Sequence, residues 1–183
     1  QDAGILANAK HFPGHGDTET DSHKTLPTID FDEKRIDSVE MYPYKKLIKE
    51  GLSSVMVAHL NVPSLEPREN YPSSLSFNVV TDLLQKELGF DGLIFTDALN
   101  MKGASNFKKP GDIDLEAFLA GNDILLFAEN VPLAIEKITE AYNNNFISDE
   151  RLAQSVKKIL HYKYKAKLNN YKPIEIQNLV TDI

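Results

Sequence analysis

The stretch that decides the fold is Ile5-Leu6-Ala7-Asn8-Ala9-Lys10-His11-Phe12-Pro13-Gly14-His15-Gly16-Asp17. Its first five residues are mostly apolar, which predicts a buried strand over Ile5–Ala9. The Pro-Gly and Gly-Asp pairs that follow predict a rigid, polar loop. Loops that leave strands in this way carry the chemistry of many α/β enzymes, so the residues after Ala9 are the first candidates for a functional site.

The same pattern of an apolar strand followed by a helix recurs along the chain. Further strands are predicted at Ser54–Ala58, Gly92–Thr96 and Ile124–Phe127. Uninterrupted apolar strands that alternate with helices are typical of parallel β/α units, whose sheet is buried on both faces. Apolar spacing and capping residues predict the helices at Asp32–Glu50, Ser76–Leu88, Asp112–Ala120, Pro132–Asn143 and from Ser148 onward.

The composition is that of a globular protein and excludes some partners. The chain has 183 residues, of which 42% are hydrophobic and 26% charged, with a net charge of -7 and no cysteine. No basic stripe is present to bind nucleic acid, and no apolar run approaches the ~20 residues of a membrane span. The lack of cysteine excludes disulfides and thiolate metal sites but leaves the cellular compartment open.

Polar side chains follow the predicted strands at their carboxyl ends. Lys10 and His11 follow the first strand, His59 the second and Asp97 the third. In a parallel β/α barrel these strand ends form the catalytic rim. Asp97 is therefore a candidate nucleophile or base, and the alternative is an N-cap of the segment Ala98–Met101.

A second candidate feature is the tripeptide Asp21-Ser22-His23. In an extended loop, residues two apart lie on the same side. A carboxylate bonded to one imidazole nitrogen fixes the tautomer, favours the protonated ring and leaves the other nitrogen for proton transfer. The alternative is an Asx turn with an incidental surface histidine.

A metal site is the competing interpretation of the loop. Nitrogen and oxygen ligands suit Zn²⁺ or Mn²⁺. The candidate ligands are His11, His15, Asp17, Asp21 and His23. However, Phe-Pro-Gly separates His11 from His15, so the two are not the i, i+4 helical pair of common zinc motifs. We therefore expect no metal and no other cofactor.

Two segments resemble the signature of glycoside hydrolase family 3, in its bacterial β-N-acetylglucosaminidase branch. The first is Lys10–Asp17 with the following Asp21–His23, and the second is Phe95–Met101. Weaker matches follow in the family's order, at Val57–His59, Ala120–Asp123 and Arg151–Tyr164. The resemblance implies a (β/α)₈ barrel in which Asp97 is the nucleophile, His23 the general acid/base and Asp21 its orienting partner.

The resemblance also implies a substrate, a terminal β-linked N-acetylglucosamine such as peptidoglycan fragments carry. Lys10 and His11 would bind its hydroxyl groups, and we add His59 to this substrate-binding set. The implied reaction is hydrolysis through a glycosyl-enzyme on Asp97. Phosphorolysis is an alternative, because a histidine base repels an anionic acceptor less than a carboxylate does, and a non-catalytic half-barrel binding module is another.

A complete barrel has eight strands, and only four are predicted here. They match the family's strands five to eight, so residues 1–168 are expected to form the C-terminal half of the barrel. The aspartate and arginine by which the family's first half holds the sugar have no counterpart. We expect that half as a partner, on the same or a separate chain. Residues 169–183 read as a linker-like tail toward a possible further domain. Localisation, in bacterial cytoplasm or periplasm, stays open.

Overall fold

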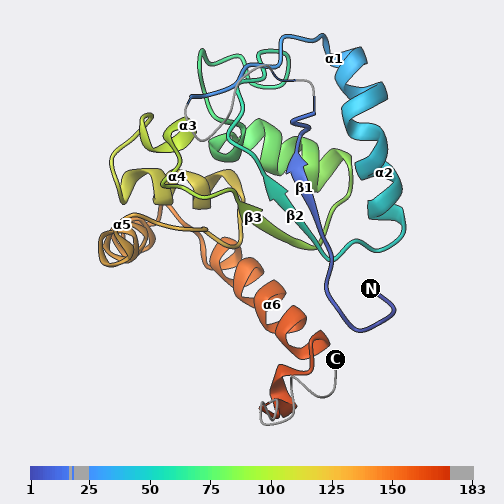
Figure 1. The fold of residues 1–183 in the computed structure, drawn as a ribbon. Coiled ribbons are helices and arrows are strands. Elements are labelled where there is room, and N and C mark those ends of the chain that lie inside the picture. The colour runs from blue at the N-terminus through green and yellow to red at the C-terminus, as the bar shows by residue number, and fades with distance from the viewer. Residues whose placement is uncertain (17, 19–24, 174–183) are drawn as a thin grey trace, which may run out of the picture.

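A computed structural model describes residues 1–16, 18 and 25–173. At its centre lies a parallel sheet of three strands in the order β1-β2-β3 (Figure 1). The strands are β1 (Asn8–Phe12), β2 (Ser54–Val57) and β3 (Leu93–Thr96). This is the α/β architecture with a parallel sheet that the strand and helix pattern predicts.

Helices follow each strand, and most match the predicted segments to within a few residues. The segment Glu33–Lys49 is one continuous helical stretch, with a π-helical middle at Ile36–Glu40. Short 3₁₀ turns lie at Ser73–Leu75 and Leu168–Asn170. The helices are α1 (Glu33–Arg35), α2 (Met41–Lys49), a π-helix (Asn78–Glu87), α3 (Lys102–Ser105), α4 (Asp112–Ala120), α5 (Val131–Asn143) and α6 (Asp149–Lys165).

Capping residues explain why the helix positions could be predicted from the nearby sequence. Asp32 and Ser148 accept hydrogen bonds from backbone N–H groups three residues ahead, at Arg35 (2.8 Å) and Arg151 (3.1 Å). These bonds satisfy N–H groups that have no partner within the helix. At the other end, Gly121 takes a positive φ of 119° directly after α4, a conformation that glycine adopts without steric cost. Of the helices in the described part of the chain, none is both long and apolar enough to span a membrane.

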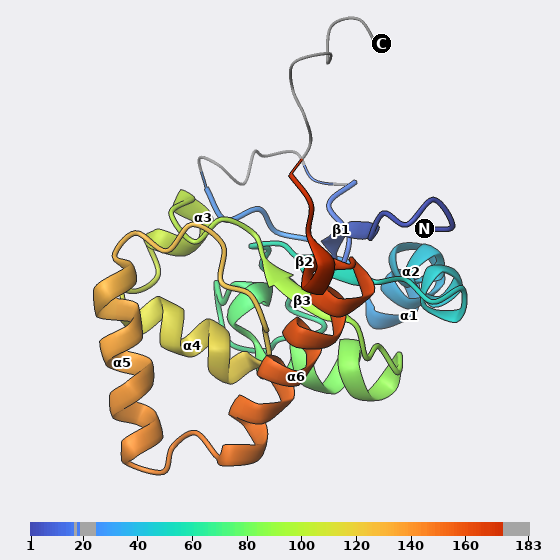
Figure 2. The same ribbon diagram turned by 90° about the horizontal axis from the view of Figure 1, so that it is seen from below.

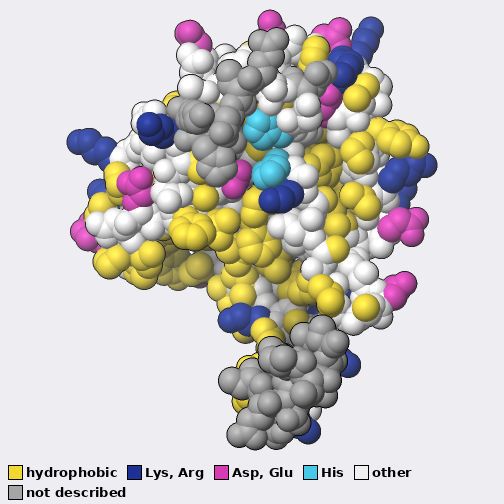
Figure 3. All heavy atoms as spheres, in the orientation of Figure 1, with side chains coloured by type: hydrophobic (Ala, Val, Ile, Leu, Met, Phe, Trp, Pro, Cys, Tyr) yellow, Lys and Arg dark blue, Asp and Glu magenta, His cyan; other side chains and the backbone are white. Residues whose placement is uncertain are grey.

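The two faces of the sheet differ in what covers them. On one face Val55, Val57 and Ile94 are fully buried against the helices. On the other face the side chains of Met56, Phe95 and Ile124, on adjacent paired segments, are only partly buried. No described helix covers this face, and hydrophobic side chains show there in the space-filling view (Figures 1 and 3).

The predicted first strand is wrong in its bounds and in its burial. The strand begins at Asn8 rather than Ile5, and Ile5 is 73% exposed. Asn8 and Lys10 are also exposed, so β1 is not buried on both faces. The physical reason is that β1 is an edge strand: among the described strands it pairs with β2 alone. Lys10 and His11 consequently lie within β1 and not after it.

The predicted fourth strand, Ile124–Phe127, is not a regular strand. Ile124 forms a single parallel bridge with Phe95, and its carbonyl accepts a hydrogen bond from the Thr96 N–H (3.0 Å). The chain then turns away at Phe127, which has a positive φ of 50° and is 66% exposed. The segment therefore runs beside β3 without extending the ladder, because the Leu126 N–H bonds the Thr96 hydroxyl (3.0 Å) and not a backbone carbonyl.

The helix α6 lies against the sheet (Figure 2), and polar side chains bond the two together. Asp123 accepts hydrogen bonds from the backbone N–H of Ile94 (3.0 Å) and from the Ser155 hydroxyl (2.5 Å). The guanidinium of Arg151 donates to the carbonyl of Asn122 (2.7 Å). Asn122 and Asp123 thus have structural roles. Beyond α6, residues 174–183 lie outside the described residues, so the linker-like tail stays a prediction.

Candidate active site

Asp97 follows directly after β3 and its carboxylate is held in one orientation. Its backbone N–H donates to the Val57 carbonyl (2.8 Å), which fixes the residue at the end of β2. Its Oδ1 accepts a hydrogen bond from the Ala98 N–H (2.8 Å), and 14% of the side chain is exposed. The alternative N-cap role is not observed, because the next helix begins at Lys102 with Met101 at its N-cap.

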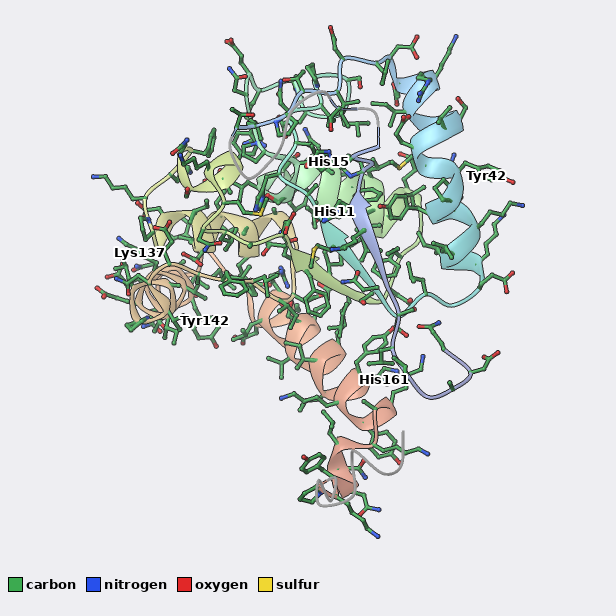
Figure 4. The ribbon with its side chains drawn as sticks, viewed as in Figure 1. His11, His15, Tyr42, Lys137, Tyr142 and His161 are labelled. Carbon is green, nitrogen blue, oxygen red and sulfur yellow. The ribbon has the colours of Figure 1, made fainter. Side chains whose placement is uncertain are left out.

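The His11 ring faces the Asp97 carboxylate and forms an ion pair with it when the ring is protonated. Its Nε2 lies 3.7 Å from Asp97 Oδ2, so the two oxygens of the carboxylate have different neighbours. His15 lies edge-on to His11, with ring centroids 6.0 Å apart, and Figure 4 shows both rings above the strands. Histidine side chains also show at the surface in Figure 3.

A bulge in β1 sets the direction of Lys10 and His11. Ala9 pairs with Val55 and Phe12 with Val57, which leaves one extra residue in β1 between these pairs. Such bulges often lie beside active sites, where they redirect a side chain. Lys10 and His11, which the sequence singled out, are the two residues in the bulge.

The loop after β1 packs on the helical segment Glu33–Lys49. A Cβ on Gly14, whose φ is 143°, would lie 2.7 Å from the Glu40 side chain. Glu40 in turn accepts two hydrogen bonds from Arg35. Sequence analysis missed this Arg35–Glu40 pair, because the two residues are five apart and meet through the π-helical turn between them.

The predicted site borders a cleft of about 420 Å³. The residues that line it include Lys10, His11, His15, Glu40 and Tyr44. A larger cleft of about 770 Å³ includes none of the predicted site residues. Its charged lining is largely paired, because Glu116 contacts Lys108 and the Tyr71 hydroxyl. We therefore place the candidate site at the smaller cleft.

His59 is inside the protein rather than on the rim. It has no exposed surface, and both ring nitrogens have partners: Nδ1 lies 2.6 Å from Ser74 Oγ and Nε2 lies 3.0 Å from the Ala98 carbonyl. Burial lowers the pKa of His59 below its ordinary 6.5, while the bond to Ala98 and the charge of Asp97 oppose that shift. The substrate-binding role predicted for His59 does not fit this geometry, since neither nitrogen faces the cleft.

Two of the predicted catalytic residues, Asp21 and His23, lie outside the described residues. The same is true of Asp17, a candidate ligand in the metal interpretation. Within the described part of the chain, no group of three or more histidine, cysteine, aspartate or glutamate side chains could hold a metal ion.

Comparison with known proteins identifies the family. Residues 1–162 match the glycosyl hydrolase family 3 N-terminal domain. The chain belongs to glycosyl hydrolase family 3. This confirms the resemblance carried by the segments Lys10–Asp17 and Phe95–Met101.

Three similar proteins are enzymes by name, and each of the three is longer than this chain. The chain is 35% identical to β-hexosaminidase A of Pseudoalteromonas piscicida, in an alignment that covers 89% of the chain and 30% of that protein. A family 3 β-N-acetylglucosaminidase from Paenibacillus sp. str. FPU-7 superposes with a TM-score of 0.89 and 38% identity, over 95% of this chain and 34% of that one. A β-glucoside phosphorylase superposes with a TM-score of 0.86 and 27% identity, over 94% of this chain and 32% of that one.

Proposed function

We propose that this chain supplies the C-terminal half of a family 3 catalytic barrel, which removes terminal β-linked N-acetylglucosamine with retention of configuration. The observation that carries the proposal is Asp97: a carboxylate at the carboxyl end of a central strand, with Oδ1 held by a backbone N–H. A carboxylate fixed in this way can attack a sugar carbon without first reorganising. The names of the similar proteins support the substrate class, and peptidoglycan-type fragments are its proposed source.

The proposed reaction has two steps on Asp97. In the first, Asp97 attacks the anomeric carbon, the glycosidic C–O bond breaks, and His23 protonates the leaving oxygen. In the second, His23 takes a proton from water, which attacks the same carbon and releases Asp97. Asp21 would bond the far side of the imidazole ring and stabilise its charged form. Two displacements at one carbon restore the β configuration.

Lys10 and His11 are the proposed sugar-binding residues. Both lie in the bulge of β1 and line the cleft, and His11 also contacts Asp97, which does not itself line that cleft. An ammonium group and an imidazole can donate hydrogen bonds to sugar hydroxyls. Because His11 Nε2 lies 3.7 Å from Asp97 Oδ2, a sugar contacting both residues would have its reacting carbon close to the nucleophile.

The products test the function. We expect the complete barrel to release free N-acetylglucosamine from an aryl β-N-acetylglucosaminide, initially as the β anomer in proton NMR spectra. An aryl β-glucoside is the matched control for the acetamido group, and its kcat/KM should be lower by at least about 10²-fold. Release of the α anomer, or equal kcat/KM for the two sugars, would contradict the proposal.

Phosphorolysis is the second candidate, because a β-glucoside phosphorylase superposes closely on this chain. The same assay with inorganic phosphate distinguishes the two reactions. Hydrolysis gives free sugar at a rate independent of phosphate. Phosphorolysis gives the sugar 1-phosphate in proportion to phosphate concentration, and that product would replace the hydrolase assignment.

The proposed acid/base is tested through the leaving group. His23→Ala should slow substrates with poor leaving groups far more than aryl glycosides, which need little protonation, by roughly 10²-fold or more. Azide should partly restore turnover of the aryl substrate, because it attacks the glycosyl-enzyme without a base. His161→Ala, at an exposed histidine on α6, is the matched control and should keep wild-type rates for both kinds of substrate. An equal loss for both leaving groups, with no effect of azide, would assign the acid to another residue.

A further inference from the structure

We propose that His59 is a positioning residue: it holds the backbone that orients Asp97 and does not touch the sugar. The inference rests on the proposed function, because it takes Asp97 as the nucleophile. It replaces the substrate-binding role that the sequence suggested for His59.

The hydrogen bonds of His59 assign its tautomer. The Ala98 carbonyl can only accept a hydrogen bond, so Nε2, 3.0 Å away, carries the proton. In the neutral ring Nδ1 then has a free lone pair, and it accepts from the Ser74 hydroxyl at 2.6 Å. With the ring neutral, His59 thus uses one nitrogen as a donor and the other as an acceptor.

Ser74 is itself held firmly. Its backbone N–H donates to the Ala58 carbonyl (3.1 Å), and its carbonyl accepts a hydrogen bond from the Asn122 side chain (2.8 Å). Ser74, Ala58 and Asn122 come from three separate parts of the chain. The position of the His59 ring is therefore fixed by contacts with distant parts of the chain and not by the rotamer preference of the histidine.

The connection to Asp97 passes through a single residue, Ala98. The Ala98 carbonyl accepts from His59, and the Ala98 N–H donates to Asp97 Oδ1. Ala98 lies in a turn before α3, where its carbonyl also accepts a hydrogen bond from the Met101 N–H (3.0 Å) and the N–H groups of Asp97 and Leu99 are bonded on either side. The His59 bond is the side-chain contact on this carbonyl. Its loss would let the Ala98 peptide plane tilt, and the Ala98 N–H would move the Asp97 carboxylate with it. A misplacement of about 1 Å at a reacting group can cost about 10² in rate.

Substitutions that keep or remove the donor test the proposal in the complete barrel. His59→Leu removes the N–H donor. It should lower kcat by about 10²-fold and should lower the rate of covalent inactivation by a 2-fluoro sugar by the same factor. KM should stay within a few-fold of the wild-type value. His59→Gln places an amide N–H near the position of Nε2 and should recover most of both rates. Ser74→Ala keeps the His59 ring but removes its hydrogen bond at Nδ1, so it should lower both rates by about tenfold.

Controls separate this role from stability and from the proposed function. Leu84→Ala removes a fully buried side chain from the π-helix. The Leu84 carbonyl accepts a hydrogen bond from the Phe90 N–H, which lies before β3, at the opposite end of that strand from Asp97. It should lower the melting temperature and leave kcat per folded molecule unchanged. If Leu84→Ala lowers kcat as His59→Leu does, or if His59→Gln is as slow as His59→Leu, positioning is overturned.

The remaining outcomes are also decisive. If His59→Leu raises KM and spares kcat, His59 binds substrate after all. If His59→Leu does not fold, unchanged rates in Ser74→Ala overturn the proposal and a tenfold loss supports it. Asp97→Ala in the same assays reports on the proposed function: if it stays active, the nucleophile assignment fails. If it is inactive while His59→Leu is unimpaired, only the positioning role fails.

Discussion

Replacing Asp97 by alanine in the complete barrel is expected to lower kcat by about 10³-fold or more. Without the carboxylate no glycosyl-enzyme can form, and the cationic transition state loses the negative charge beside it. Asp97→Asn should be similarly slow, because its amide can still accept from the Ala98 N–H through oxygen but cannot attack the sugar. Steady-state kinetics on an aryl β-N-acetylglucosaminide measure both variants.

Covalent labelling identifies the nucleophile directly. A 2-fluoro or 5-fluoro sugar should trap the glycosyl-enzyme, and peptide mapping should find the label on Asp97. Asp91→Ala is the matched control, since Asp91 is an exposed aspartate just before β3, at the opposite end of that strand from Asp97. It should retain wild-type kcat. A label on another carboxylate, or an active Asp97→Ala enzyme, would move the nucleophile elsewhere.

The helices could be predicted because their signals are local. Asp32 and Ser148 bond N–H groups only three residues away, and Gly121 ends α4 through its own backbone conformation. The short helix α3 (Lys102–Ser105) was not predicted. It has no side-chain hydrogen bond at its N-cap, so no capping residue marks its start.

The strands were predicted less well because their bounds depend on distant partners. An apolar run shows that a strand is possible, but pairing decides where it begins. The run from Ile5 joins the ladder only from Asn8, where Ser54 lies opposite, and Ile124 is limited to one bridge with Phe95. The two outer segments were therefore misjudged, while the central strands β2 and β3 match the predictions to within one residue.

The same distinction applies to the candidate site. The position of Asp97 at a strand end could be predicted, because the apolar strand before it is visible in the sequence; its role as nucleophile stays a proposal. The environment of His59 could not be found, because Ser74 and Ala98 lie 15 and 39 residues away along the chain. A histidine at a strand end suggests a rim residue, and only the fold shows that this ring points inward.

The open face of the sheet leads to the last expected result, which concerns completeness. Met56, Phe95 and Ile124 lie side by side on it, partly buried, and no described element covers them. In a closed barrel such side chains fill the interior, and the free edge of β1 pairs with another strand. Residues 1–183 alone should therefore associate with themselves or melt without cooperativity, which light scattering and calorimetry measure.

Activity should follow closure of the barrel. Residues 1–183 alone should show no turnover of an aryl β-N-acetylglucosaminide, because the proposed site residues Asp97, Lys10 and His11 would contact only one side of the sugar. Supplying the N-terminal half barrel, fused or as a second chain, should restore turnover by at least about 10³-fold, since positioning requires the whole set of contacts. The same half barrel added to the Asp97→Ala chain is the control and should restore folding without activity. A monomeric, cooperatively melting and active 183-residue chain would contradict the half-barrel proposal, because its sheet would then need no partner.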